Sequence, residues 1–389
     1  MVHTLTYTAI LDTTASAKIT QNGFLSTFHY TREMFMFITA LALVYVYGGK
    51  PFDTRRFWKK RAIGVLIPYV AWSLIYQLII TRTFDPLNFI GTFLFNVVTG
   101  SASFQLYYIL LTLEFYIIFP WFLSILPRLA RRPWLTLAVS FAIELVITGG
   151  VNIGLPALHL PAATANIVGL FFDRFAPVYQ LYFVMGGLTA IYLPQIKAWL
   201  ARWGIWLIPL ATLGIAILEV HYLYALDQGV SLGSAVSVIQ PAMVPFSIAI
   251  IALLYWVSLQ FTQRATRLKA TRSKHVWHEL SDSAFGVYLV HPLFLTNIFL
   301  LEVVPQIKGW PTALVVILVW AGTSACSIAL TLLLLRIPGL SRLMGRERPA
   351  PEWMSVRWAR LRATNWRQIP ARVALNGTPN EKEVMSETD

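Results

Sequence analysis

The sequence predicts an all-α, polytopic integral membrane protein, in which a bundle of helices crosses the lipid bilayer. Of its 389 residues, 57% are hydrophobic and only 13% are charged, and the mean hydropathy is +0.61. An average soluble domain carries about 25% charged residues, and a chain this apolar has too few charged side chains to cover a water-facing surface. The composition therefore excludes a soluble globular protein and makes the lipid bilayer its first expected partner.

Apolar stretches long enough to cross the membrane recur along most of the chain. A spanning helix needs about 20 mostly apolar residues. Nine stretches of about this length lie within residues 1–335, which we expect to form one membrane domain. Membrane helices tolerate the internal prolines in several of them, because neighbouring groups satisfy the freed carbonyls. We expect the spans at about residues 32–47, 62–80, 106–126, 134–151, 176–193, 205–223, 238–260, 283–303 and 312–335.

The basic residues predict the orientation of these spans. The chain has 31 Lys and Arg against 18 Asp and Glu, and most of the basic residues follow the first, third, fifth, seventh and ninth spans. Because basic loops stay in the cytoplasm, the C-terminus is expected to be cytoplasmic and the excess of charge marks orientation rather than nucleic-acid binding. Nine spans then place the N-terminus outside, so we expect a tenth helix before Met1.

The last segment, residues 336–389, is expected to be a cytoplasmic tail. Three Trp and four Arg alternate within residues 352–367, a pattern typical of a helix that lies on an anionic membrane surface. The polar stretch from Asn376 onward is expected to be disordered. No oligomeric state is predicted.

Several classes of site are excluded by the residues that the chain lacks. Its single cysteine, Cys326, can form neither an internal disulfide nor a cysteine-rich zinc site. The sequence contains no HExxH, P-loop or GxGxxG motif. We therefore expect no metal site.

Three strings go beyond generic membrane helices. They are FHYTREMFMFITALALVYVY (residues 28–47) with FWKKRAIGVLIPYVAWSLIY (57–76), QLYYILLTLEFYIIFP (105–120) and SDSAFGVYLVHPLFL (281–295). In this order they resemble the acyltransferase-3 family of bacterial membrane O-acyltransferases, in particular the exopolysaccharide-modifying branch. The resemblance implies ten helices in the bacterial cytoplasmic membrane and transfer of an acyl group, which we expect to be acetyl, from cytoplasmic acyl-CoA to a hydroxyl of an extracytoplasmic glycan.

His3 is the predicted general base. The family resemblance places it at the histidine of the family's Arg-and-His signature, whose arginine would lie before Met1. A histidine can accept and return a proton at neutral pH, because its ordinary pKa is near 6.5. The alternative is a solvated side chain close to a frayed chain end.

Arg32 and Glu33 stand at the outer end of the first predicted span. In the functional interpretation, Arg32 faces the acceptor or the developing oxyanion and Glu33 orients His3. In the structural alternative, Arg32 reaches to water and Glu33 stabilises a helix N-terminus. Neighbouring residues on a helix point about 100° apart, so the two are not expected to form a simple ion pair.

The basic run between the first two spans is the predicted site for acyl-CoA. Lys59, Lys60 and Arg61 precede the Ile-Pro-Tyr helix, where the family has corresponding basic residues, and Arg and Lys side chains suit the phosphates of CoA. Arg55 and Arg56 are interpreted as orientation signals, and ordinary basicity of a cytoplasmic loop remains the alternative for the whole run.

Polar side chains within the spans are candidates for the substrate pocket. Ionisable residues inside a membrane domain are functional candidates by default. The predicted pocket residues are Gln105, Tyr107, Tyr108, Glu114 and His291. Gln105 cannot titrate, so only a hydrogen-bonding role is open to it, and a structural hydrogen bond to an adjacent helix is the alternative for His291.

Two other functions compete with acyl transfer. A transporter could use polytopic helices with buried charges to move a glycan or an acidic metabolite without chemistry, and a truncated family member could be inactive. The clustering of charged residues at one inner loop and one outer mouth favours the enzyme over a transporter, whose binding residues lie on broken helices in matched halves.

Overall fold

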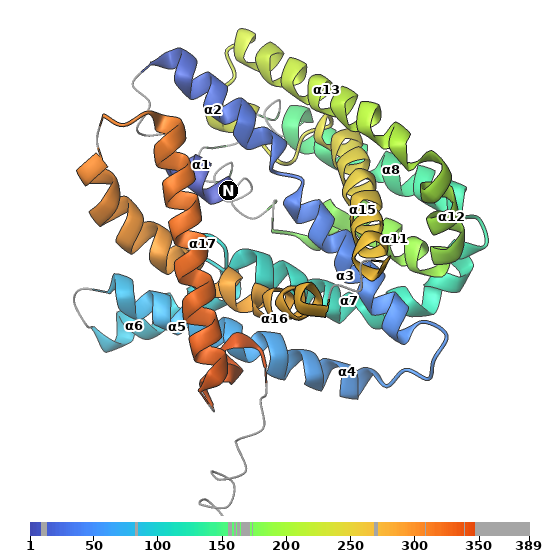
Figure 1. Ribbon diagram of the computed structural model, residues 1–389, viewed down its shortest axis with the longest axis horizontal. Helices are drawn as coiled ribbons and strands as arrows, with labels where there is room; N and C mark the ends of the chain where they lie inside the picture. Colours follow the sequence, from blue (N-terminus) through green and yellow to red (C-terminus); the bar gives the residue numbers. More distant parts are fainter. Residues whose placement is uncertain are drawn as a thin grey trace, which may run out of the picture. The chain divides into compact units, whose positions relative to one another are not determined.

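The described part of the chain consists of helices and the short connections between them. The computed structural model describes residues 1–8, 14–81, 85–154, 158, 161, 164, 172, 174–267, 271–307, 309–337 and 339–346, and no β-strand occurs within these residues (Figure 1). The predicted all-α fold class is thereby confirmed. A helix is suited to the interior of a bilayer, because it satisfies its backbone hydrogen bonds within its own segment.

The α-helices carry the labels of Figure 1, and the short helix α14 is numbered in the same series. They are α1 Val2–Thr8, α2 Ala15–Thr27, α3 Thr31–Tyr47, α4 Thr54–Arg61, α5 Ile67–Ile80, α6 Pro86–Thr99, α7 Tyr107–Ala130, α8 Pro133–Gly149, α11 Gln180–Ile191, α12 Leu193–Trp203, α13 Leu207–Asp227, α14 Leu232–Ala235, α15 Met243–Arg267, α16 Thr271–Phe294 and α17 Thr312–Arg336. Two π-helical segments, η2 (Ala62–Leu66) and η6 (Leu295–Val303), continue α4 into α5 and extend α16, and a short 3₁₀ helix, η8 (Leu340–Met344), follows α17.

The helices explain the apolar stretches of the sequence. Among the described residues, seven helices are long and apolar enough to cross a membrane, so the protein is an integral membrane protein. Two predicted spans fall on shorter helices, namely α3 and the apolar segment Ala176–Ile191 that contains α11. The apolar helix α6 lies between the second and third predicted spans.

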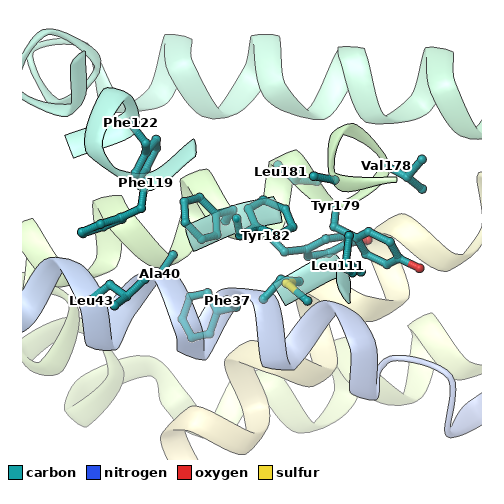
Figure 2. Close-up of a cluster of buried hydrophobic side chains, with 14 of the residues drawn as sticks. Phe37, Ala40, Leu43, Leu111, Phe119, Phe122, Val178, Tyr179, Leu181 and Tyr182 are labelled. Carbon is teal, nitrogen blue, oxygen red and sulfur yellow. The ribbon is translucent and has the colours of Figure 1, made fainter. Parts of the chain in front are cut away.

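A close contact between α3 and α11 organises the first half of the bundle. A Cβ atom added to Gly186 of α11 would lie 2.2 Å from the carbonyl oxygen of Phe37 on α3, so only glycine permits this approach. Figure 2 shows the apolar cluster around this contact, in which side chains of α3, α7 and α11 pack together. Its members include Phe37, Ala40, Leu43, Leu111, Phe119, Phe122, Leu181 and Tyr182.

The basic helix α4 is attached to α7 at a proline. Pro120 has no N–H group to donate to the carbonyl of Tyr116, four residues earlier in α7. The indole Nε1 of Trp58 on α4 donates to that carbonyl at 3.0 Å. Pro120 therefore creates the acceptor that holds α4 against α7.

The second half of the bundle packs around α5, α16 and α17. The Tyr76 hydroxyl of α5 donates to the carbonyl of Leu289 on α16 at 2.6 Å. The indole of Trp72 on α5 donates to the carbonyl of Leu343 in η8 at 3.1 Å. The first residues of the predicted tail, up to Arg346, thus pack on this half, while the predicted surface helix at 352–367 and the polar end lie outside the described residues.

Candidate active site

An elongated cavity of about 860 Å³ is lined by α1, α3, η2, α7, α16, η6, α17 and η8. Along α16 its lining extends from Ser281 to His291, which corresponds to about 15 Å of helix. We call the end with His3, His29 and His291 the histidine end. The cavity thus connects two well-separated regions of the bundle.

The opposite end of the cavity is named the basic end. It is lined by Gly64, Asp282 and Arg346, and it adjoins α4 through η2. Arg346 forms an ion pair with Asp282 there. The cavity therefore connects the region of the densest basic run with the region of the predicted base.

More than half of the predicted site residues line this one cavity. They come from α1, α3, α7 and α16 and from the turn before α7, and they are distant in sequence. They are His3, Arg32, Gln105, Tyr107, Tyr108 and His291.

His3 and His291 form a stacked pair at the histidine end. Their ring centroids are 5.4 Å apart and their planes are inclined by 23°. The ring of Phe104 contacts both, at 4.4 Å from His3 and 5.8 Å from His291. Burial, followed by the proximity of His291 and Arg32, lowers the pKa of His3 well below its usual value. His3 is therefore neutral at pH 7, the form that accepts a proton.

A tyrosine-rich network supports the wall beside this pair. The Tyr288 hydroxyl donates to the backbone carbonyl of Gln105, and the Gln105 amide donates to the carbonyl of Leu289 at 3.4 Å. The Nδ1 atom of His291 hydrogen-bonds to the carbonyl of Tyr288 at 2.8 Å. The Gln105 side chain thus acts as a hydrogen-bond donor in this wall.

Arg32 is held at the cavity by the two tyrosines that begin α7. The Tyr108 hydroxyl donates to the backbone carbonyl of Arg32 at 2.8 Å, and the guanidinium Cζ of Arg32 lies 5.4 Å from the ring centroid of Tyr107. Arg174 approaches the same ring at 5.0 Å, and its Nη1 donates to the carbonyl of Thr99 at 2.8 Å. Each of these cation–ring contacts is attractive by itself, and together they bring two positive charges to one side of the cavity.

His29 is a cavity residue that the sequence analysis did not select. It is buried and lines the histidine end, where it hydrogen-bonds to the backbone of Val236. Burial, followed by the charge of Arg32, lowers the pKa of His29 to about 3. The available signal was its place three residues before Arg32, since residues at this spacing lie on one face of a helical turn.

Glu33 and Glu114 lie outside the cavity lining. Glu33 is buried in the helix cluster, within electrostatic reach of Tyr108 and Tyr182, because adjacent helical residues diverge by about 100° and Arg32 is the one that faces the cavity. The carboxylate of Glu114 accepts a hydrogen bond from the backbone N–H of Ala176 at 2.9 Å. Glu114 thus supports the turn that starts the segment containing α11.

The predicted CoA residues divide into two groups. Lys59 and Lys60 are exposed on α4 and are not among the cavity-lining residues. The Arg61 guanidinium lies 4.9 Å from the ring centroid of Tyr116, a side chain that does line the cavity. Arg61 is not a lining residue either, but it is the one of the three that contacts a side chain of the cavity wall.

The donor set of the site does not resemble a metal centre. In the described part of the chain, no group of three or more His, Cys, Asp and Glu side chains is placed to hold a metal ion. What the cavity offers instead is neutral imidazole, guanidinium and phenol groups, which bind anions and transfer protons.

Comparison with known proteins identifies one family. A sequence model described as an acyltransferase domain matches residues 1–334, which includes every cavity-lining residue except those after α17. No curated protein and no solved structure matches the chain.

Proposed function

Because this chain belongs to the acyltransferase-3 family and is a membrane acyltransferase, we propose that it moves an acyl group from cytoplasmic acyl-CoA to a hydroxyl of an extracytoplasmic glycan. The observation that carries the proposal is the single cavity that joins the basic end to the histidine end. A donor and an acceptor on opposite sides of a membrane need such a shared space.

The basic end is the proposed entrance for acyl-CoA. Basic segments stay in the cytoplasm, so α4 and the C-terminus are assigned to the cytoplasmic side of the bacterial plasma membrane. Arg61 at the cavity wall, with the exposed Lys59 and Lys60 beside it, offers cations for the CoA phosphates. Arg346 supplies a further guanidinium at the same end.

Two glycines line this entrance, where larger side chains would narrow it. Gly64 and Gly345 face each other, since a Cβ on Gly64 would lie 3.7 Å from the carbonyl oxygen of Gly345. The two glycine backbones thus pack closely in one wall of the basic end. The thin pantetheine arm of CoA can pass along this wall, and the nucleotide part can stay with the basic side chains outside.

The histidine end is the proposed place of transfer. The acceptor oxygen attacks the thioester carbonyl as neutral His3 takes the hydroxyl proton. The carbon–sulfur bond then breaks, and His3 returns the proton to the sulfur to give the ester and CoA thiol. Arg32 lies within electrostatic reach of His3 and can stabilise the negative oxygen of the tetrahedral intermediate. We expect acetyl as the acyl group.

Reconstituted vesicles test this proposal. Acyl-CoA with a labelled acyl group is supplied at the face that carries α4, and a polysaccharide acceptor at the other face. We expect labelled glycan and equimolar CoA thiol. Movement of intact glycan without CoA release would support the transporter, and an absence of both would support an inactive protein.

A pair of matched variants tests the role of the cavity. Ala284 lines it midway along α16, and Ala284→Trp is expected to abolish transfer by blocking the path between the two ends. Ala216→Trp makes the same change at an exposed position on α13, outside the cavity lining, and should leave transfer unchanged. Equal activity of the two variants would contradict a reaction path through this cavity.

A further inference from the structure

Pro292 creates an unusual acceptor beside His291. Within α16, the N–H group four residues after Tyr288 would normally bond to the Tyr288 carbonyl, but that position is Pro292 and has no N–H. The Nδ1 atom of His291 takes this place at 2.8 Å. The proline therefore frees the carbonyl that the preceding histidine uses.

This bond determines the tautomer of His291. A carbonyl oxygen only accepts hydrogen bonds, so the hydrogen must reside on Nδ1. The neutral ring then has its lone pair on Nε2, on the far side of the ring from the backbone of α16. The bond at Nδ1 thus holds His291 in the tautomer whose Nε2 accepts a proton, because the hydrogen-bond partner of one ring nitrogen determines which nitrogen carries the hydrogen.

The turn that holds His291 is itself fixed. The hydroxyl of Tyr288 donates to the Gln105 carbonyl, and Tyr76 donates to the carbonyl of Leu289 at 2.6 Å. Helix α5 and the turn before α7 therefore hold this part of α16. Such support is what a reacting group needs to keep its geometry during a reaction.

We propose that His291 is a second catalytic base and that His3 and His291 act as one acid–base unit holding a single proton. This inference rests on the proposed function. The unit takes the proton as the acceptor O–H bond breaks and the new C–O bond forms, and it returns the proton to the sulfur as the C–S bond breaks. The stacking distance of 5.4 Å opposes protonation of both rings.

The groups around the pair favour this single-proton state. From α3 the guanidinium of Arg32 faces it, and His29 lies just before that helix; Tyr108 faces it from α7 and Tyr288 from α16. Arg32 is the permanent charge in this set, and it is positive. A second proton at the pair would therefore face repulsion from both the neighbouring ring and Arg32.

Substitution of His291 by asparagine tests the roles of its two ring nitrogen atoms separately. His291→Asn keeps an amide donor near the Nδ1 position, so the bond to the Tyr288 carbonyl can persist, but removes Nε2. We expect kcat to fall at least about 100-fold, the usual scale for a lost general base, with little change in KM for acyl-CoA. His221→Gln on α13, outside the cavity lining, is the matched control and should retain full activity.

A double variant tests whether the two histidines act together. His3→Asn and His291→Asn should each cause nearly the same loss, and the double variant should lose hardly more than either, because residues that act as a unit are not additive. Multiplying losses would overturn the shared unit. An active wild type with an unchanged His291→Asn variant would overturn the inference alone, whereas an inactive wild type would overturn the proposed function.

The tautomer provides a readout other than activity. Pro292→Ala restores an N–H donor to the Tyr288 carbonyl and so competes with His291. In protein labelled with ¹⁵N-histidine, we expect the wild-type His291 signal, assigned by its loss in His291→Asn, to show hydrogen on Nδ1 and the Pro292→Ala variant to shift toward hydrogen on Nε2. An identical spectrum in both proteins would contradict the role of Pro292.

Discussion

The contact between α3 and α11 predicts that one methyl group, placed outside the cavity lining, disturbs the candidate active site. In Gly186→Ala the new Cβ atom would lie 2.2 Å from the carbonyl oxygen of Phe37 and 3.0 Å from the Cβ of Ala40. Carbon and oxygen atoms do not approach closer than about 3.3 Å even in favourable contacts. The two helices must therefore separate by about 1 Å.

This displacement reaches the cavity through α3. Phe37 and Arg32 are five residues apart on this helix, or about 7.5 Å, and Tyr108 holds the Arg32 carbonyl from α7. A misplacement of about 1 Å in a catalytic group can lower the rate about 100-fold. Overpacking of the helix contact should also destabilise the fold by about 1–3 kcal/mol.

The measurement combines transfer kinetics with thermal unfolding of the purified protein. We expect Gly186→Ala to lower both kcat and the unfolding temperature. Gly91→Ala is the matched control, because Gly91 lies within α6 and no atom is within 4 Å of its added Cβ; alanine should be neutral or slightly stabilising there. If Gly186→Ala behaves like Gly91→Ala, the close packing of α3 on α11 is refuted.

Three further predictions follow from individual residues. Arg61→Ala should raise KM for acyl-CoA about tenfold with kcat nearly unchanged, as expected when uniform binding is lost, and an unchanged KM would remove Arg61 from the donor site. Burial lowers the pKa of His29 to about 3, so between pH 6.5 and 3 this histidine is protonated in the unfolded chain but not in the folded protein, and the free energy of unfolding falls as the pH drops. His29→Gln should flatten this decline when thermal unfolding is measured as a function of pH. An equally steep decline in the variant and the wild type would contradict the prediction. Gly345→Ala places a side chain at a φ of +72° with its Cβ 2.5 Å from the carbonyl oxygen of Gly64, so we expect a loss of at least about 1–2 kcal/mol in unfolding free energy and slower transfer, whereas wild-type stability would argue against this contact.

The membrane fold was predictable because it depends on the hydropathy of consecutive residues, which is read directly from the sequence. Hydropathy marks the long helices directly, since about 20 apolar residues are needed wherever a helix crosses. The same reasoning did not find α6, whose 14 residues Pro86–Thr99 are apolar but short. Because the prediction required about 20 apolar residues, the 14-residue helix α6 was not among the predicted spans.

The site was predictable residue by residue only in part. His3, Arg32 and His291 could be selected from motifs, and helical geometry already required Arg32 and Glu33 to diverge. Which of the two faces the cavity depends on how α3 rotates against α11 at Gly186. Glu114 was a candidate as a carboxylate within a predicted span, and its hydrogen-bond partner in the structure is a backbone N–H of Ala176, 62 residues later in the chain.

The sequence by itself determined the all-helical membrane character, the family and the residue types able to transfer a proton or hold a phosphate. Those features depend on composition and on local spacing, including the step from Pro292 back to the Tyr288 carbonyl. Only the tertiary structure brought His3 and His291 into a stack and joined the histidine end to the basic end through one cavity. Stacking and enclosure depend on how helices far apart in sequence pack, and that packing is decided by close contacts such as Gly186 against Phe37 rather than by any local pattern.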